Sequence, residues 1–247
     1  MKSNLKIAVY TVILGPYDGL LPQPTMKGVD YICFTDQSFK SRKWSIQPIT
    51  IENEDPGRTV RKYKLMPHKA LPEYDASVYI DGNYLIIKDI RPLVEKVFSN
   101  APMGIFDHNQ CSDARNCVYD EYDAIIRLQH KRGKLKDDPL IMKQQIQYYK
   151  NEGYPKNQGL IFAAVLIRKH HMPIVDNTME FWYNQILKWS KRDQLSFNYS
   201  AWKTGLKPYY IPGNLRRHEY FFLLSKHRSD YRWKYFKYRL KQLIGLI

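Results

Sequence analysis

The sequence predicts an α/β fold with a mixed, mainly parallel sheet. Apolar segments of strand length alternate with segments of helical spacing along the chain, as in sheets built from strand–helix–strand units. Residues 160–167 are apolar at every position, which is typical of a strand buried on both faces. The 247 residues are enough for one large domain, or for one domain with a C-terminal appendage.

The N-terminal half is expected to begin with three strands. An apolar run at residues 6–14 ends at a Gly-Pro pair, and a second run covers residues 29–35. Residues 44–51 form the third strand, and Pro48 favours an edge position because proline cannot donate a ladder hydrogen bond. The elements expected next are a helix at 58–69, a strand–turn–strand unit at 77–87, a helix at 90–99 and a strand at 103–106.

The C-terminal half is expected to contain three helices and two strands. Asp138 and Pro139 suit the N-cap and first turn of a long helix, and Gly153 lies just past its end. Large apolar side chains recur with helical spacing at residues 173–190. The remaining elements are the strand at 160–167, a helix at 192–202 and a short strand at 209–211.

Positive charge is concentrated near the C-terminus. The formal net charge is +15, and residues 216–247 contain nine Lys or Arg residues but only two acidic ones. A local basic segment differs from a uniformly basic surface, and it points to one anionic partner at one end of the protein. We therefore predict a domain at residues 1–215 and a basic, aromatic C-terminal segment at residues 216–247.

The C-terminal segment has the pattern of a membrane-surface helix. Basic and aromatic residues interleave at residues 231–241, and residues 243–247 end the chain with apolar character. A basic helix with aromatic residues on its other face suits an anionic membrane surface. The alternative is a helix packed on the domain with a solvated basic face.

The positive charge also permits a non-enzymatic protein that binds nucleic acid, but no RNA- or DNA-binding signature is present, so we expect no nucleic-acid partner.

Cysteine usage and hydropathy predict a cytoplasmic location. The three cysteines lack the paired spacing of a metal site and are expected to be reduced thiols. No apolar run reaches the roughly 18 residues that a membrane span needs, and residues 1–5 lack the apolar core of a signal peptide. Peripheral attachment to the inner face of the plasma membrane would then depend on the C-terminal segment.

The most informative motif is Asp81-Gly82-Asn83, which follows a strand-like run within residues 77–86. In an open α/β sheet, ligands bind outside the carboxyl ends of the strands. Carboxylate and amide oxygens at this place suit a hard divalent cation that carries a phosphorylated ligand. The alternative is a simple hairpin, because Asp-Gly is a favoured hairpin turn.

Phosphate groups would have to be bound without a glycine-rich loop. Neither a GxGxxG nor a P-loop sequence is present, so a metal ion and basic side chains would have to meet the charge. Arg58, Arg61 and Lys64 recur at three-residue spacing and are expected to share a helix face that clamps a diphosphate. The alternative is a solvated basic face.

A polar segment contains His108, Arg115, Tyr119 and Glu121. Loops rich in these residue types often line functional sites. The alternative is an ordinary polar loop that leads into a helix.

Asp193 and Gln194 lie at the start of a predicted helix. Asp193 is either an N-cap or a carboxylate that orients or deprotonates a sugar hydroxyl.

These motifs together resemble a glycosyltransferase-like family of plants and bacteria, formerly a domain of unknown function, that includes plant mucilage-related enzymes. The resemblance covers roughly residues 5–212 and depends on the order and spacing of its motifs. It rests on the basic helix at 58–72, YIDGN at 79–83, QIQYYKNEG at 145–153, LIFAAVLIRKH at 160–170 and RDQLSF at 192–197.

The resemblance implies a GT-A-like fold and transfer of a hexose-type unit from a nucleotide sugar, of UDP type, to a glycan or lipid-linked acceptor. Asp81 takes the place of the first residue of a DxD metal motif and would hold Mn²⁺ or Mg²⁺. Asn83, which departs from that motif, and His218, assigned from its position alone, would assist. Surface-polysaccharide synthesis is the expected pathway.

The remaining candidates receive roles on the same basis. Arg61 and Lys64, with Arg58 on the same face, would bind the donor diphosphate, and Thr11 and Asp36 would contact the nucleoside. Asp193 is the first candidate for the catalytic base and Glu121 the second. The residues expected to line the acceptor side are His108, Arg115, Tyr119 and Gln194. Asn83 keeps open the alternative of a sugar-nucleotide binder without turnover.

Overall fold

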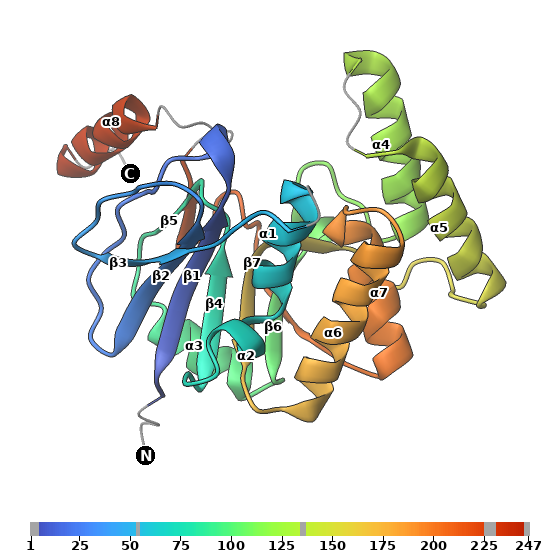
Figure 1. Ribbon diagram of the computed structural model, residues 1–247, viewed down its shortest axis with the longest axis horizontal. Helices are drawn as coiled ribbons and strands as arrows, with labels where there is room; N and C mark the ends of the chain where they lie inside the picture. The colour runs from blue at the N-terminus through green and yellow to red at the C-terminus, as the bar shows by residue number, and fades with distance from the viewer. Residues whose placement is uncertain (1–4, 53–54, 134–136, 225–230, 245–247) are drawn as a thin grey trace.

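The computed structural model describes residues 5–52, 55–133, 137–224 and 231–244. Within these residues, seven strands form one sheet in the order β3-β2-β1-β4-β7-β6-β8 (Figure 1). The strands are β1 (Ile7–Ile13), β2 (Val29–Thr35), β3 (Trp44–Pro48), β4 (Ala76–Ile80), β6 (Met103–Asp107), β7 (Ile161–Lys169) and β8 (Tyr209–Ile211). The predicted α/β class is confirmed, and β3 lies at the sheet edge as Pro48 indicated.

The sheet is mixed and mainly parallel. β1 runs parallel to β2 and β4, and β2 runs parallel to β3. β7 lies between β4 and β6 and runs antiparallel to both. An unbroken apolar run therefore predicted two-faced burial correctly, but it contains no information on strand direction.

Helices cover both faces of this sheet (Figure 1). The helices are α1 (Pro56–Leu65), α2 (Pro67–Ala70), α3 (Arg91–Phe98), α4 (Val118–Arg132), α5 (Pro139–Asn151), α6 (Pro173–Lys188), α7 (Asp193–Thr204) and α8 (Arg232–Leu243). The helix predicted at 58–69 is divided at Met66, because Pro67 restricts the preceding residue and cannot donate a backbone hydrogen bond. The side chain of Asp138 accepts from the Leu140 N–H and caps α5 as predicted.

Two apolar clusters hold the layers together. On one face, α3 contributes Leu93 and Val97 to a cluster with strand residues such as Val78. On the other face, α6 and α7 contribute Trp182 and Phe197. These clusters fix the ends of α1 and α7 against the strands, and that placement builds the candidate site.

The hairpin interpretation of the Asp-Gly turn is wrong. β4 pairs with β1 and β7, whereas β5 (Tyr84–Ile86) leaves the sheet and pairs antiparallel with β9 (Phe221–Leu223). Both flanks of β4 are already occupied, so the chain cannot fold back beside it. The turn at residues 81–83 thus lies at the carboxyl end of a central strand.

The C-terminal segment packs on the domain. β9 pairs with β5, and a helix, α8, is present where a basic helix was predicted. Tyr238 of α8 is buried against Leu21 and Leu85. Residues 245–247, part of the predicted apolar end, lie outside the described residues. In the part of the chain that the structure describes, no helix has the length and apolar character needed to cross a bilayer.

Candidate functional site

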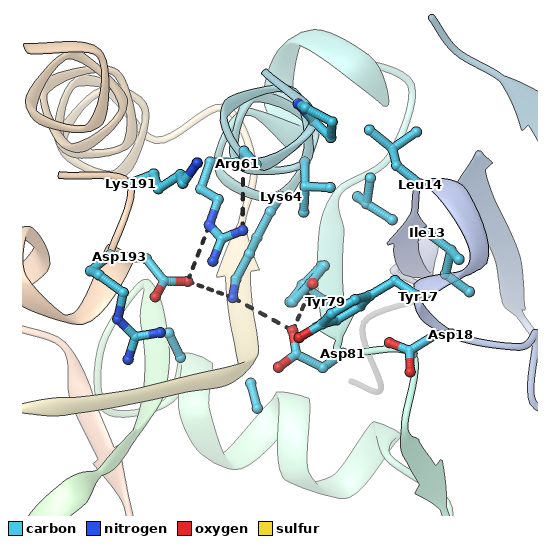
Figure 2. Close-up of a pocket in the computed structure, with 18 of the residues that line it drawn as sticks. Ile13, Leu14, Tyr17, Asp18, Arg61, Lys64, Tyr79, Asp81, Lys191 and Asp193 are labelled. Atoms are coloured by element: carbon cyan, nitrogen blue, oxygen red, sulfur yellow. Dashed lines mark hydrogen bonds and ion pairs between the residues drawn. The ribbon is translucent and has the colours of Figure 1, made fainter. Parts of the chain in front are cut away.

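A cavity of about 470 Å³ lies at the carboxyl ends of β1 and β4 (Figure 2). This is the edge at which open α/β sheets bind ligands. Its charged lining residues come from the β1–β2 connection, α1, the turn after β4 and the start of α7. They are Asp18, Arg61, Lys64, Asp81, Lys191, Arg192 and Asp193.

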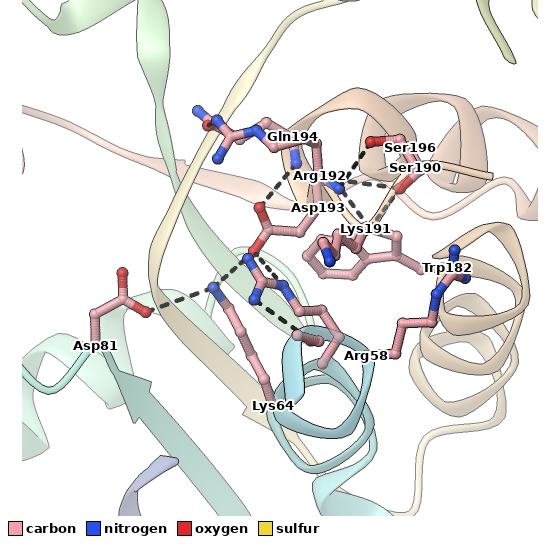
Figure 3. Close-up of polar contacts among 12 residues, drawn as sticks. Arg58, Lys64, Asp81, Trp182, Ser190, Lys191, Arg192, Asp193, Gln194 and Ser196 are labelled. Carbon is pink, nitrogen blue, oxygen red and sulfur yellow. Dashed lines mark hydrogen bonds and ion pairs between the residues drawn. The ribbon is translucent and has the colours of Figure 1, made fainter. Parts of the chain in front are cut away.

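The centre of the site is the ammonium group of Lys64 (Figure 3). Its Nζ lies 2.8 Å from Oδ2 of Asp193 and 3.6 Å from Oδ1 of Asp81. Lys64 and Asp193 are both buried. Arg61, one turn earlier on α1, brings its Nε to 4.0 Å from the same Asp193 oxygen. Two cations and two carboxylates from three separate segments therefore meet in one cavity.

The backbone of Lys64 is held from the sheet. The hydroxyl group of Tyr10 donates to the Lys64 carbonyl oxygen at 2.6 Å, and the buried guanidinium group of Arg168 donates to it at 2.9 Å. Carbonyl groups in the last turn of a helix lack helical partners. These two bonds satisfy one of them and fix the end of α1 over β1 and β7.

Asp81 is oriented by its own strand. Tyr79 donates its hydroxyl group to Oδ1 of Asp81 at 2.7 Å, and the Asp81 N–H donates to the Ala164 carbonyl oxygen of β7 at 2.9 Å. Gly82 permits a close approach, because a Cβ atom there would lie 3.0 Å from Oδ2 of Asp18. The carboxylate of Asp18 consequently lies against the same turn as Asp81.

The interpretation of Asp193 as a helix N-cap is wrong. Arg192 occupies the cap position and Asp193 is the first residue of α7. One carboxylate oxygen of Asp193 accepts from Lys64 and the other from the Gln194 N–H at 3.1 Å. The carboxyl group is thus committed to the cavity cation.

The electrostatic environment keeps Asp193 ionised. Burial by itself would raise the pKa of this carboxyl group. The charges of Lys64, Arg61 and Arg192 outweigh burial and hold the pKa well below its usual range. A carboxylate with so low a pKa is a weak base for as long as these cations surround it.

Arg58 does not share the orientation of its neighbours on α1. Its guanidinium group donates to the Leu187 and Trp189 carbonyl oxygens at 2.7 and 3.1 Å, at the end of α6. Three residues turn a helix by about 300°, so each step in the series drifts by about 60°. Arg61 and Lys64 face the cavity, whereas Arg58 fastens α1 to α6.

A second polar cluster adjoins the cavity. The buried Glu121 of α4 pairs with Arg115 at 2.6 Å, and a guanidinium nitrogen of Arg192 lies 3.8 Å from it. His108 approaches Arg115 at 3.1 Å between ring and guanidinium nitrogens. Burial and then the charge of Arg115 lower the pKa of His108. Because Arg192 also lines the cavity, this cluster is connected to the site.

Two other acceptor-side candidates have structural contacts. Tyr119 donates its hydroxyl group to the Tyr154 carbonyl oxygen at 2.7 Å within an aromatic cluster. Gln194 lines the cavity and also donates to the Ile161 carbonyl oxygen at 3.0 Å. The polar segment leads into α4, which begins at Val118, as the loop-to-helix alternative expected.

Thr11 and Asp36, the nucleoside candidates, do not line this cavity. Thr11 is buried within β1. Asp36 accepts from the Gly15 N–H at 2.9 Å and joins the ends of β1 and β2. Both residues lie near the edge of the sheet at which the cavity is found.

The predicted metal ligands do not assemble into one set. His218 packs against Phe106, and its ring nitrogens contact the Pro212 carbonyl oxygen and the Tyr220 N–H. Asn83 is buried in the turn after β4. Across residues 5–52, 55–133, 137–224 and 231–244, no three His, Cys, Asp or Glu side chains form a group that could hold a metal ion. These residues do not fit a closed cation site.

Sequence reasoning missed several cavity residues. Tyr17 and Asp18 follow the Gly-Pro pair that ends β1, and Lys191 and Arg192 adjoin Asp193. The sequence signal that could have identified them is their position, because the first two residues follow a strand end and the last two precede a helix start. Tyr17 lies beside Asp18 and Asp81 (Figure 2), and burial and the charges of these two carboxylates raise its pKa.

The fold and the cavity define the protein as a single Rossmann-like α/β domain with a charged site at the carboxyl ends of its strands. Residues 6–214 match the family TOD1/MUCI70, glycosyltransferase-like domain, and the chain belongs to this family. The resemblance inferred from the motifs is confirmed.

The chain is also similar to the probable hexosyltransferase MUCI70 of Arabidopsis thaliana. The two sequences are 26% identical over 145 residues, which cover 55% of this chain. The match spans 23% of the plant protein, so most of the plant protein lies outside the aligned region.

Proposed function

We propose that this protein is a glycosyltransferase that moves a hexose-type unit from a nucleoside diphosphate sugar to a glycan or lipid-linked acceptor. The observation that carries the proposal is the position of Lys64 and Arg61 in the cavity beside Asp81 and Asp193. Membership of a glycosyltransferase-like family supports the same reaction class. A UDP-type donor and surface-polysaccharide synthesis are the finer proposals.

Lys64 and Arg61 are suited to stabilise the leaving diphosphate. Negative charge builds up on that group as the glycosidic bond breaks, and preorganised cations in a partly enclosed site lower the energy of the transition state. The diphosphate would compete with Asp193 for both cations. Lys191 and Arg192 would add positive charge at the edge of the cavity.

A divalent cation, Mn²⁺ or Mg²⁺, stays a prediction. The cavity is lined by four cations and three carboxylates, so its formal charge is close to neutral. A diphosphate would gain from an additional positive charge there. We assign the direct contacts with the diphosphate to Lys64 and Arg61 and the predicted cation to Asp81, because Mg²⁺ sites commonly combine one or two carboxylates with substrate phosphates.

Asp193 is proposed to orient the acceptor hydroxyl group, with Glu121 as the second candidate. Asp193 is a weak base in the ion pair described above, and a diphosphate that engaged Lys64 would weaken this pair. Its carboxylate would then become more basic when the donor is bound. Glu121, in contrast, lies in the Arg115 cluster on the far side of Arg192.

Product formation distinguishes this proposal from a sugar-nucleotide binder without turnover. The experiment incubates the full chain with a panel of UDP- and GDP-sugars, with and without Mn²⁺ or Mg²⁺, and measures release of the nucleoside diphosphate. We expect release from one donor class and a reduced rate of release in Arg61→Gln. Donor binding that calorimetry detects, without release of the nucleoside diphosphate in any of these reactions, with or without an added acceptor, would favour the non-catalytic binder.

A cytoplasmic location is a further prediction, and cell fractionation tests it.

A further inference from the structure

Helix α8 has two opposite faces with different surroundings. One face carries Tyr235 and Tyr238, which pack with Leu21, Leu85 and Phe222. The Tyr238 ring lies 4.7 Å from that of Phe222. Just before the helix, Tyr231 donates its hydroxyl group to the Leu20 carbonyl oxygen at 2.7 Å. These contacts fix the orientation of α8 on the domain.

The opposite face carries an exposed apolar stripe. Trp233, Phe236 and Leu243 are 62%, 55% and 79% exposed, and Leu240 and Ile244 are also exposed. At about 100° per residue these five positions fall within about 100° of the helix circumference. The Trp233 and Phe236 rings stack at 5.7 Å. A contiguous apolar surface that is turned away from its own domain indicates a binding surface.

Basic residues flank this stripe on both sides. Lys234, Lys237 and Lys241 fall on one side by helical geometry, and Arg232 and Arg239 on the other. Lys237 also lies over the Trp233 ring at 5.0 Å. No acidic residue occurs between Arg232 and Leu243.

We propose that the exposed face of α8, defined by Trp233, Phe236, Leu240, Leu243 and Ile244, is a docking surface for an anionic lipid bilayer. An apolar stripe with Trp and Phe between rows of Lys and Arg is the composition of helices that lie in the membrane interface. The stripe enters the acyl boundary while the flanking cations meet lipid phosphates. A second copy of the chain is a poorer occupant, because an antiparallel pair of α8 helices would bring like charges together.

The contacts of α8 place the helix at the same end of the domain as the cavity. Leu20 and Leu21 follow closely after Tyr17 and Asp18, which line it, and Leu85 follows the turn at residues 81–83. In Figure 1, α8 lies beyond the end of the sheet at which β1 ends. Docking would bring the cavity end of the domain toward the bilayer, which suits a lipid-linked acceptor. The docking itself does not depend on the proposed transferase activity.

Vesicle co-sedimentation of the full chain tests the proposal. We expect binding to vesicles of phosphatidylcholine with phosphatidylserine, little binding to phosphatidylcholine alone, and release at high salt. Trp233→Ser with Phe236→Ser should weaken binding about tenfold or more, because both side chains enter the interface. The matched control is Leu140→Ser with Leu187→Ser, which changes exposed leucines on other helices and should bind like the wild type.

A charge series separates the electrostatic contribution. Changing Lys234, Lys237 and Lys241 together to Gln should weaken binding about tenfold or more. The same changes at Lys96, Lys143 and Lys207, exposed lysines elsewhere, should have little effect. All changed side chains except the half-buried Lys234 are exposed, so the melting temperatures should stay close to that of the wild type. No vesicle binding, equal binding to neutral vesicles, or equal loss in both control variants would overturn the proposal. Concentration-dependent dimers that vanish in the stripe variant, without lipid binding, would assign the face to a second copy.

Discussion

Lys64 and Asp193 form a buried ion pair of 2.8 Å although 129 residues separate them in the sequence. The pair joins the last turn of α1 to the first residue of α7 across the ends of the central strands. Its ammonium group also lies 3.6 Å from Asp81. An anionic ligand in the cavity must compete with these carboxylates, so the stability of the fold and ligand binding depend on the same contact.

Removing Lys64 should destabilise the fold. Lys64→Met leaves the buried Asp193 carboxylate without its nearest cation, and the loss of one partner of a buried pair costs about 3–5 kcal/mol. Urea unfolding measures this free energy. The double variant Lys64→Met with Asp193→Leu should recover part of the loss, because no uncompensated charge is left. A single variant as stable as the wild type would contradict this view of the pair.

Acid should weaken the fold through Asp193. Its pKa is lowered in the folded state, so its contribution to stability is complete above the ordinary carboxyl pKa of about 3.9. That contribution is lost as pH falls below this value toward the folded-state pKa. The free energy of unfolding of the wild type should therefore fall more steeply below about pH 4 than that of Asp193→Asn. Parallel curves for the two proteins would show that Asp193 is not the titrating group.

Arg61 and Arg58 should have separable roles on the same helix. Arg61→Gln should weaken binding of UDP or GDP about tenfold or more, since a charged hydrogen bond contributes about 1.5–3 kcal/mol. Arg58→Gln should reduce stability through its lost contacts with the end of α6 and leave nucleotide affinity nearly unchanged. Calorimetry and thermal unfolding on both variants make the comparison. If both variants lost the same nucleotide affinity, Arg58 would also contact the ligand, and the proposed division of roles would be wrong.

Asp193→Asn should lower turnover about 10²-fold or more if the carboxylate acts on the acceptor hydroxyl group. The amide keeps the size of the side chain and can still accept from Lys64, so most of the fold should persist. Turnover with the donor identified by the panel is the measurement, with circular dichroism to verify folding. Near wild-type turnover would limit Asp193 to a structural ion pair, and Glu121→Gln would become the next variant.

Asp81→Ala tests the predicted divalent cation. If Mn²⁺ or Mg²⁺ binds at this turn, the wild type should bind a nucleoside diphosphate more tightly with metal, and the variant should lose that difference. The backbone contact of residue 81 with Ala164 does not involve the side chain, so the fold should persist. If metal does not change the nucleotide affinity of the wild type, the prediction of a cation is wrong, and Lys64 and Arg61 neutralise the diphosphate by themselves.

Local sequence signals determined most of the elements. Apolar runs located β1, β2 and β7 because strand burial depends on a few consecutive side chains. The Asp138–Pro139 start of α5 followed from capping, which involves neighbouring residues alone. The extent of α4 was not predicted, because its sequence mixes polar and aromatic residues and its buried face became apparent only against α5 and α7.

The sequence by itself therefore determined the α/β class, the family and the edge of the sheet at which the cavity lies. Only the tertiary structure decided that Lys64 pairs with Asp193, that Arg58 serves α6, and that β5 pairs with β9 instead of β4. Helix periodicity and strand propensity act over a few residues. A buried ion pair or a strand pairing depends on which distant segments the packed core brings together, and no local pattern encodes that choice.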